Sequence, residues 1–185
     1  MQQTTNKKEH IILVDDNLAN LRTGINILSK NYTVSTALSG EKLFSLLKNE
    51  KPALILLDID MPEMNGYEVI KILKSETETY EIPVVFLTAK TDSGDELEGL
   101  SLGAIDYITK PFQPALLLKR IEVHLLVETQ KKKLEKLALQ LQYYNDNLQK
   151  IVYEKTKNVL DLQDTLLKTM AEMVECRDDI TGGHI

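Results

Sequence analysis

Five consecutive apolar residues at 53–57, followed at once by Asp58, constrain the fold more than any other feature of this chain. An uninterrupted apolar run of this length is typical of a strand that is covered on both faces, as strands in parallel sheets are. Open sheets of that class bind their ligands beyond the carboxyl ends of the strands. Asp58 is therefore expected at the sheet edge where functional sites form.

The first 112 residues repeat this arrangement of a short apolar run followed by a helical pattern. Strands are expected at residues 10–14, 32–36, 53–57, 82–88 and 105–109. Apolar residues with helical spacing lie between them, at 18–28, 43–47, 69–73 and 97–102. This alternation predicts an α/β fold with a doubly wound, five-stranded parallel sheet in the order 2-1-3-4-5.

The sequence after Pro114 has a different pattern, because no proline or glycine occurs again until Gly182. It permits one helix over residues 114–178. A narrow stripe of apolar residues at heptad spacing is typical of a coiled coil, and it consists of Val127, Leu134, Leu137, Leu141, Tyr144, Leu148 and Ile151. We expect a parallel two-stranded coiled coil, and hence a homodimer; a solitary or back-folded helix is the alternative.

The stripe slips by one residue after Ile151, which predicts a local disturbance of the supercoil. Beyond the slip it continues through Val152, Val159, Leu162, Leu166 and Met173, with Lys155 and Thr169 as polar members.

Three carboxylates follow two strands that are neighbours in the predicted order. Asp15 and Asp16 end the first strand pattern, and Asp58 ends the third, so all three are expected in one pocket. Like charges at short range raise one another's pKa unless a cation neutralises them. Magnesium suits such a site because Mg²⁺ prefers oxygen ligands. No glycine-rich phosphate loop follows the first strand, which argues against a bound nucleotide.

Two further polar residues end strands at the same edge: Thr88 after the fourth strand and Lys110 after the fifth. A lysine ammonium and a threonine hydroxyl both donate hydrogen bonds to phosphoryl oxygens. With Asp58 as a nucleophilic carboxylate, the set meets the needs of phosphoryl transfer, which are positioning and charge neutralisation.

Residues 9–127 resemble the receiver domain of two-component response regulators. The resemblance rests on the sequences at 12–16 (ILVDD), 56–62 (LLDIDMP), 64–66 (MNG), 83–89 (PVVFLTA), 103–104 (GA) and 110–112 (KPF). It implies a flavodoxin-like fold in which Asp58 accepts a phosphoryl group from a sensor histidine kinase.

The same resemblance assigns roles to the other residues of the pocket. It implies that magnesium is held by Asp16, Asp58, the backbone carbonyl of Asp60 and, through water, Asp15. Thr88 and Lys110 would contact the phosphoryl oxygens. Tyr107 would be the switch aromatic that turns inward when Thr88 moves; a half-buried strand residue is the alternative. The Lys110–Pro111 peptide bond would be cis.

The last residues, 170–185, resemble the entry to HD-GYP domains, which hydrolyse cyclic di-GMP, and His184 corresponds to a metal-binding histidine of that family. No His-Asp dipeptide or Gly-Tyr-Pro sequence is present, so this chain is not itself expected to be an enzyme. The predicted organisation is a disordered start at 1–8, a receiver domain at 9–127, a coiled-coil signalling helix at 128–175, and the beginning of an output domain of a longer regulator at 176–185.

Composition restricts the partners of the chain. A net charge of −6 disfavours nucleic acid, because phosphate backbones are bound by basic surfaces. The single cysteine, Cys176, fits a reducing compartment, and no apolar stretch is long enough for a membrane span, so a cytoplasmic location is expected.

Two other functions are compatible with parts of the sequence. Asp58-Ile59-Asp60 also fits the Asp-x-Asp motif of haloacid-dehalogenase-like phosphatases, although that motif is expected after the first strand. A coiled-coil scaffold with an inactive receiver is the other alternative.

Overall fold

The computed structural model describes residues 8–89 and 99–181, with side chains up to Met173. The chain divides into a first unit, Met1–Thr129, and a second unit, Gln130–Ile185. No helix in these described ranges is long and apolar enough to cross a membrane.

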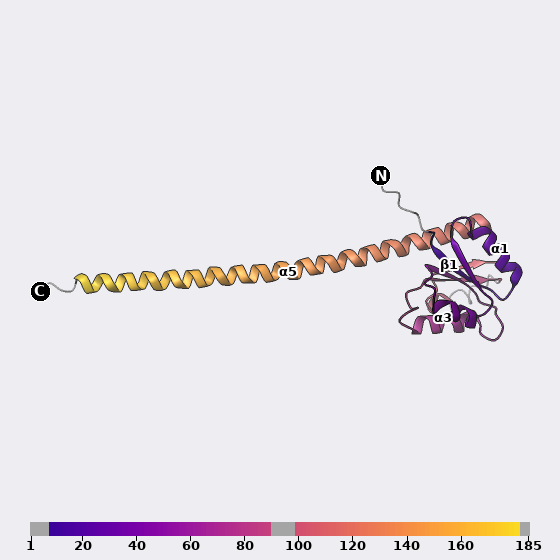
Figure 1. Cartoon of the computed structure of the whole chain (residues 1–185), viewed down its shortest axis with the longest axis horizontal. Helices are drawn as coiled ribbons and strands as arrows, with labels where there is room; N and C mark the ends of the chain where they lie inside the picture. The colour runs from indigo at the N-terminus through magenta and orange to yellow at the C-terminus, as the bar shows by residue number, and fades with distance from the viewer. Residues whose placement is uncertain (1–7, 90–98, 182–185) are drawn as a thin grey trace. The chain divides into compact units, whose positions relative to one another are not determined.

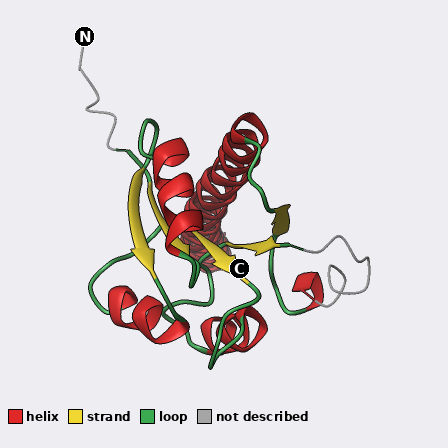
Figure 2. Cartoon of the chain, turned by 90° about the vertical axis from the view of Figure 1, so that its right-hand side faces the viewer, coloured by secondary structure: helices red, strands yellow, loops and turns green. Residues whose placement is uncertain are grey.

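The first unit is a five-stranded parallel sheet with helices on both faces (Figure 2). The strands are β1 (His10–Val14), β2 (Thr33–Ala37), β3 (Leu54–Asp58), β4 (Val84–Thr88) and β5 (Asp106–Thr109). The helices are α1 (Leu18–Leu28), α2 (Gly40–Leu47), α3 (Gly66–Ser75) and α5 (Pro114–Thr181), some of which Figure 1 labels. The strand order is β2-β1-β3-β4-β5, which confirms the predicted topology.

The predicted strands are confirmed to within one or two residues at their ends, whereas α2 and α3 each begin three residues before the predicted starts at 43 and 69. The fourth strand begins at Val84 rather than at residue 82. Pro83 precedes it, and proline has no N–H for the strand ladder, although its carbonyl accepts a hydrogen bond from the Ile55 amide at 2.9 Å. Of the helical segment predicted at 97–102, residues 99–101 are helical, and residues 97–98 lie outside the described part.

Alternate residues of each central strand enter two separate cores, as the pleat requires. In β3, Ile55 and Leu57 pack on the side covered by α2 and α3, whereas Leu54 and Leu56 pack on the side covered by α1 and α5. All four side chains are fully buried. The parallel pairing of β3 with β1 and β4 places Asp58 at the carboxyl end of the sheet, beside Leu87 of β4.

Side-chain caps begin the helices that follow the strands. The Asn17 side chain accepts a hydrogen bond from the Ala19 amide at the start of α1. At α3, Asn65 and Glu68 form a reciprocal capping box. Gly66, the next residue, packs so closely on the preceding loop that an added Cβ would lie 2.5 Å from the Asp58 carbonyl oxygen.

In the described residues of the second unit, α5 continues to Thr181, so the helix predicted at 114–178 is confirmed. Its apolar residues are exposed; the exposed fraction is 66% for Leu134, 61% for Leu141 and 51% for Ile151. The coiled coil expected from this stripe stays a prediction.

Candidate functional site

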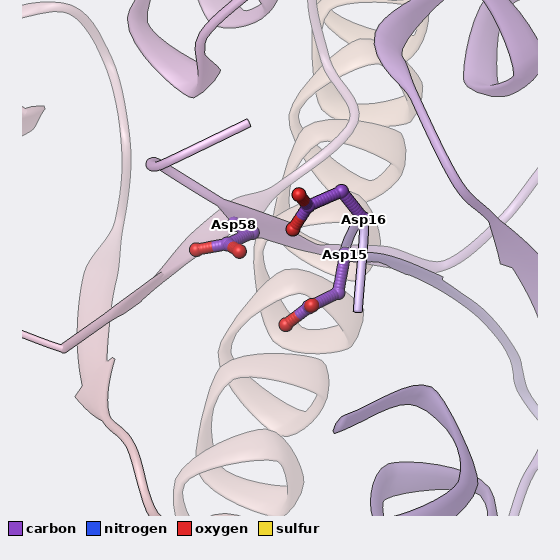
Figure 3. A group of neighbouring side chains, drawn as sticks. All are labelled: Asp15, Asp16 and Asp58. Atoms are coloured by element: carbon purple, nitrogen blue, oxygen red, sulfur yellow. The ribbon is translucent and has the colours of Figure 1, made fainter. Parts of the chain in front are cut away.

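The three predicted carboxylates lie together at the carboxyl edge of the sheet. Asp15 and Asp16 follow β1, Asp58 ends the neighbouring β3, and Figure 3 shows their side chains around one small region. Each contributes an oxygen to a group in which all oxygens lie within 4.8 Å of one another. Asp15 and Asp58 are buried, with 0% and 2% exposed, while Asp16 is exposed to solvent.

Lys110 links two of these carboxylates. Its ammonium lies 2.7 Å from Oδ1 of Asp58 and 3.2 Å from Oδ2 of Asp15. Its backbone N–H donates to the Thr88 carbonyl at 2.7 Å, and the Lys110–Pro111 bond is cis, as the resemblance implied. Burial by itself would lower the pKa of Lys110, but the hydrogen bond with Asp58 and the negative charges of Asp58 and Asp15 outweigh it and raise the pKa. The lysine therefore stays positively charged at neutral pH.

Lys110 only partly offsets the effect of burial on the Asp58 carboxyl group. Burial raises the pKa of Asp58 most strongly and the charge of Asp15 raises it further, whereas the hydrogen bond and charge of Lys110 oppose the rise without cancelling it. Among the described residues, the group of three carboxylates is paired with one ammonium, that of Lys110, which contacts Asp15 and Asp58. Such a set of oxygen donors with excess negative charge fits a divalent cation such as magnesium.

Asp15 is held in place by groups that the sequence analysis missed. The Asn20 side-chain amide donates to both carboxylate oxygens of Asp15 at 3.0 Å. The backbone N–H of Asn17 donates to Oδ1 of Asp15 at 2.9 Å. Asn20 lies in the first turn of the helix that follows the acidic pair, and that position is the signal that could have identified it. These bonds orient Asp15 without adding positive charge.

The remaining predicted residues lie on neighbouring elements. Thr88 ends β4, with 6% exposed, one position after Leu87, which is paired with Asp58. Asp60 is exposed in the loop after β3, and its N–H lies 3.4 Å from Oδ1 of Asp58. Tyr107 is half-buried in β5, paired with Phe86, and packs against the core under α2 and α3. His184 lies outside the described residues.

A second polar cluster, which the sequence did not reveal, joins β5 to the start of α5. The Asp106 carboxylate accepts hydrogen bonds from Arg120 at 2.7 Å and His124 at 2.9 Å. Burial would raise the pKa of Asp106, but these bonds and the Arg120 charge lower it on balance. The cluster attaches α5 to the strand that contains Tyr107.

Comparison with known families agrees with this geometry. The sequence model for the response regulator receiver domain matches residues 11–122. This chain belongs to the receiver family. Because the match includes Asp58-Ile59-Asp60 at the end of the third strand, these residues are part of a receiver domain, and the phosphatase alternative has no further support.

Similar curated proteins are considerably longer than this chain. A probable cyclic di-GMP phosphodiesterase of Vibrio cholerae is 37% identical over 175 residues, which cover 95% of this chain but 38% of that protein. The response regulator PleD of Caulobacter vibrioides is 39% identical over 112 residues, or 60% of this chain and 25% of that protein. The chain therefore spans well under half the length of these relatives.

Solved receiver structures have the same fold. The chemotaxis protein CheY4 of Vibrio cholerae superposes with a TM-score of 0.60 at 28% identity, covering 62% of this chain and 97% of that one. The BeF3-activated DrrB receiver domain superposes with a TM-score of 0.58 at 33% identity, covering 64% of this chain and 97% of that one. The flavodoxin-like fold class predicted from the sequence is confirmed.

Proposed function

We propose that this receiver is a phosphorylation switch in which Asp58 accepts a phosphoryl group from the phosphohistidine of a sensor kinase. The observation that supports this most strongly is the buried Asp58 carboxylate, 2.7 Å from the Lys110 ammonium and grouped with Asp15 and Asp16. A nucleophilic carboxylate beside a fixed positive charge is the arrangement that phosphoryl transfer requires.

The transfer forms an O–P bond at Asp58 and breaks the N–P bond of the phosphohistidine, whose ring nitrogen leaves with the electron pair. Lys110 neutralises charge on the transferred group, and the Thr88 hydroxyl donates to one of its oxygens. Asp16, Asp58, the backbone carbonyl of Asp60 and, through water, Asp15 would hold magnesium. When bound, Mg²⁺ supplies further positive charge next to the phosphoryl oxygens.

The switch would act through β5 and α5. Thr88 and Tyr107 reposition after phosphorylation, and the Asp106 cluster transmits a movement of β5 to α5. The helix then continues into residues 128–175, which form a parallel coiled-coil homodimer. The exposed apolar stripe there supports this assembly, because a lone helix gains nothing by exposing it to water.

The output would be a separate catalytic domain rather than this chain. Similarity over 175 residues to a probable cyclic di-GMP phosphodiesterase supports an HD-GYP output domain that begins at residues 176–185 in a longer regulator. A cytoplasmic location, with no nucleic-acid or membrane partner, stays a prediction from composition.

The phosphoryl-acceptor role is tested by incubating the chain with acetyl phosphate and magnesium and measuring its intact mass. Wild type should gain the mass of one phosphoryl group, and the product should be sensitive to hydroxylamine, as an acyl phosphate is. Asp58→Asn should gain nothing, and the matched control Glu81→Gln, an exposed carboxylate, should react like wild type. A wild-type chain that never gains mass would favour the inactive-receiver scaffold instead.

A further inference from the structure

The second unit has an unusual distribution of charge around its exposed apolar stripe. The stripe occupies the first and fourth positions of each heptad on both sides of the slip at Ile151 and Val152, and its large side chains from Leu134 to Met173 are more than half exposed. In a coiled coil, the residues immediately beside such a stripe face the flanks of the partner helix. They therefore decide which partner fits.

These flanking positions contain no charged residue between Ala138 and Met170. Most are amides or threonines, and the amides are Gln140, Asn145, Asn147, Asn158 and Gln163. The charged residues of the same stretch lie on the opposite side of the helix, among them Asp146, Lys150, Glu154, Asp161, Asp164 and Lys168. The exception is Lys155 on the stripe itself, whose long stem lets its ammonium reach water.

Charges at flanking positions are the usual means by which coiled coils select a different partner or repel their own copies. A flank without charge neither repels an identical helix nor attracts a complementary acidic or basic one. The surface is therefore suited to a second copy of this chain.

The amides also favour one alignment of the two copies. In a parallel, in-register pair, the residue that directly precedes the first position of a heptad lies opposite a residue of the partner helix whose number is five higher. Gln140 then faces Asn145 of the second copy, and Asn158 faces Gln163 of the second copy. Each side-chain amide has both donors and an acceptor, so both pairs are complementary. One pair lies on each side of the slip, whereas an antiparallel arrangement would separate the members of both pairs.

We infer that the second unit binds a second copy of this chain in parallel and in register, through the apolar stripe flanked by the amide pairs Gln140–Asn145 and Asn158–Gln163. This inference rests on the dimer of the proposed function and adds its alignment and its source of specificity. It also explains how identical helices associate without ion pairs between them.

The test uses the whole 185-residue chain and two double variants of one pair. Gln140→Glu with Asn145→Lys places opposite charges across the interface, and Gln140→Lys with Asn145→Lys places like charges there. Sedimentation equilibrium at low salt should give a dimer dissociation constant about tenfold higher for the like-charge variant than for the opposite-charge one, because two symmetry-related pairs change sign. The difference should vanish near 1 M salt, where the Debye length falls to about 3 Å.

A matched control, Gln142→Lys with Gln149→Lys, adds two positive charges to the outer side of the helix. Its dimer dissociation constant should stay within about twofold of the wild-type value. If wild type is a dimer but both flank variants have equal dissociation constants, the inferred alignment is wrong while the dimer stands. If wild type is a monomer at all concentrations, the coiled-coil part of the proposed function fails, and this inference fails with it.

Discussion

The two units of this chain use apolar residues in opposite ways. In the first unit, the central strands bury every apolar side chain against helices on one face or the other, as Leu56 and Leu57 of β3 do. In the second unit, apolar residues at heptad spacing remain largely exposed. The first unit therefore contains both sides of its own core, whereas the apolar residues of the second unit are left exposed by the rest of the described chain.

The proposed function assigns reception of the signal to the first unit and its transmission to the second. The acidic site needs a rigid sheet edge, because a nucleophile and a charge must be held within a few tenths of an ångström. The proposed coiled coil needs only an exposed apolar surface on the second unit, against which a partner helix can change its packing.

Removing a core side chain should distinguish the units most strongly. Leu56→Ala, at a fully buried position, should lower the free energy of unfolding of the first unit by about 2–5 kcal/mol. Leu141→Ala, at a position 61% exposed, should leave that value within about 0.5 kcal/mol but weaken dimerisation. Urea unfolding and sedimentation equilibrium measure the two effects, and equal destabilisation of the first unit by both variants would contradict the contrast.

Magnesium should stabilise the first unit alone. At a concentration 100 times its dissociation constant, a ligand that binds only the folded state adds about 2.7 kcal/mol to the free energy of unfolding. Asp16→Asn removes an exposed carboxylate of the site and should abolish most of this gain, whereas Glu41→Gln on α2 should preserve it. Thermal unfolding with and without magnesium provides the measurement; an undiminished gain in Asp16→Asn would remove this residue from the metal site.

A methyl group at Gly66 should disturb the loop that follows Asp58. The added Cβ would lie 2.5 Å from the Asp58 carbonyl oxygen and 2.9 Å from Cα of Ile59, so backbone must move, and we expect a loss of about 2 kcal/mol in stability with slower phosphorylation. Gly40→Ala is the matched control, because this glycine also begins a helix but meets side chains of Val69 and Met64. Gly40→Ala should lose less stability and should keep the wild-type rate of phosphorylation. Equal phosphorylation rates in the two variants would contradict a specific role for the close packing at Gly66.

The Asp106 cluster should give a smaller, pH-dependent effect. The pKa of Asp106 in the folded state is lowered from its ordinary value of 3.8, so the native state binds fewer protons than the unfolded state. The stability that the ionised carboxylate contributes is therefore present above pH 3.8 and is lost as the pH falls through the folded-state pKa. Asp106→Asn should therefore cost about 1.5 kcal/mol at pH 7, with the two curves converging below about pH 4. Urea unfolding from pH 7 to pH 3 tests this, and a gap that persists undiminished to pH 3 would exclude the carboxylate charge as the cause.

Much of the fold could be predicted because periodicity reports burial directly. Apolar runs identified the five strands, and the lack of proline and glycine identified α5. Strand ends then brought Asp15, Asp16, Asp58 and Lys110 together, since parallel strands end at one edge.

The contacts that could not be predicted depend on packing between distant segments. Asn20, Arg120 and His124 are residues of ordinary helix surfaces, and only the placement of α1 and α5 on the sheet gives them carboxylate partners. The close approach of Gly66 to the Asp58 carbonyl likewise has no local signature. Sequence patterns thus located the charged groups of the site, whereas the groups that orient them required the structure.

The central claim is that Asp58, among several neighbouring carboxylates, is the phosphoryl acceptor. The most direct test treats the chain with acetyl phosphate and magnesium, reduces the acyl phosphate with borohydride, and locates the resulting homoserine by peptide mass spectrometry. We expect homoserine at position 58 and at no other carboxylate. Homoserine at position 15, 16 or 60, with position 58 unmodified, would contradict it.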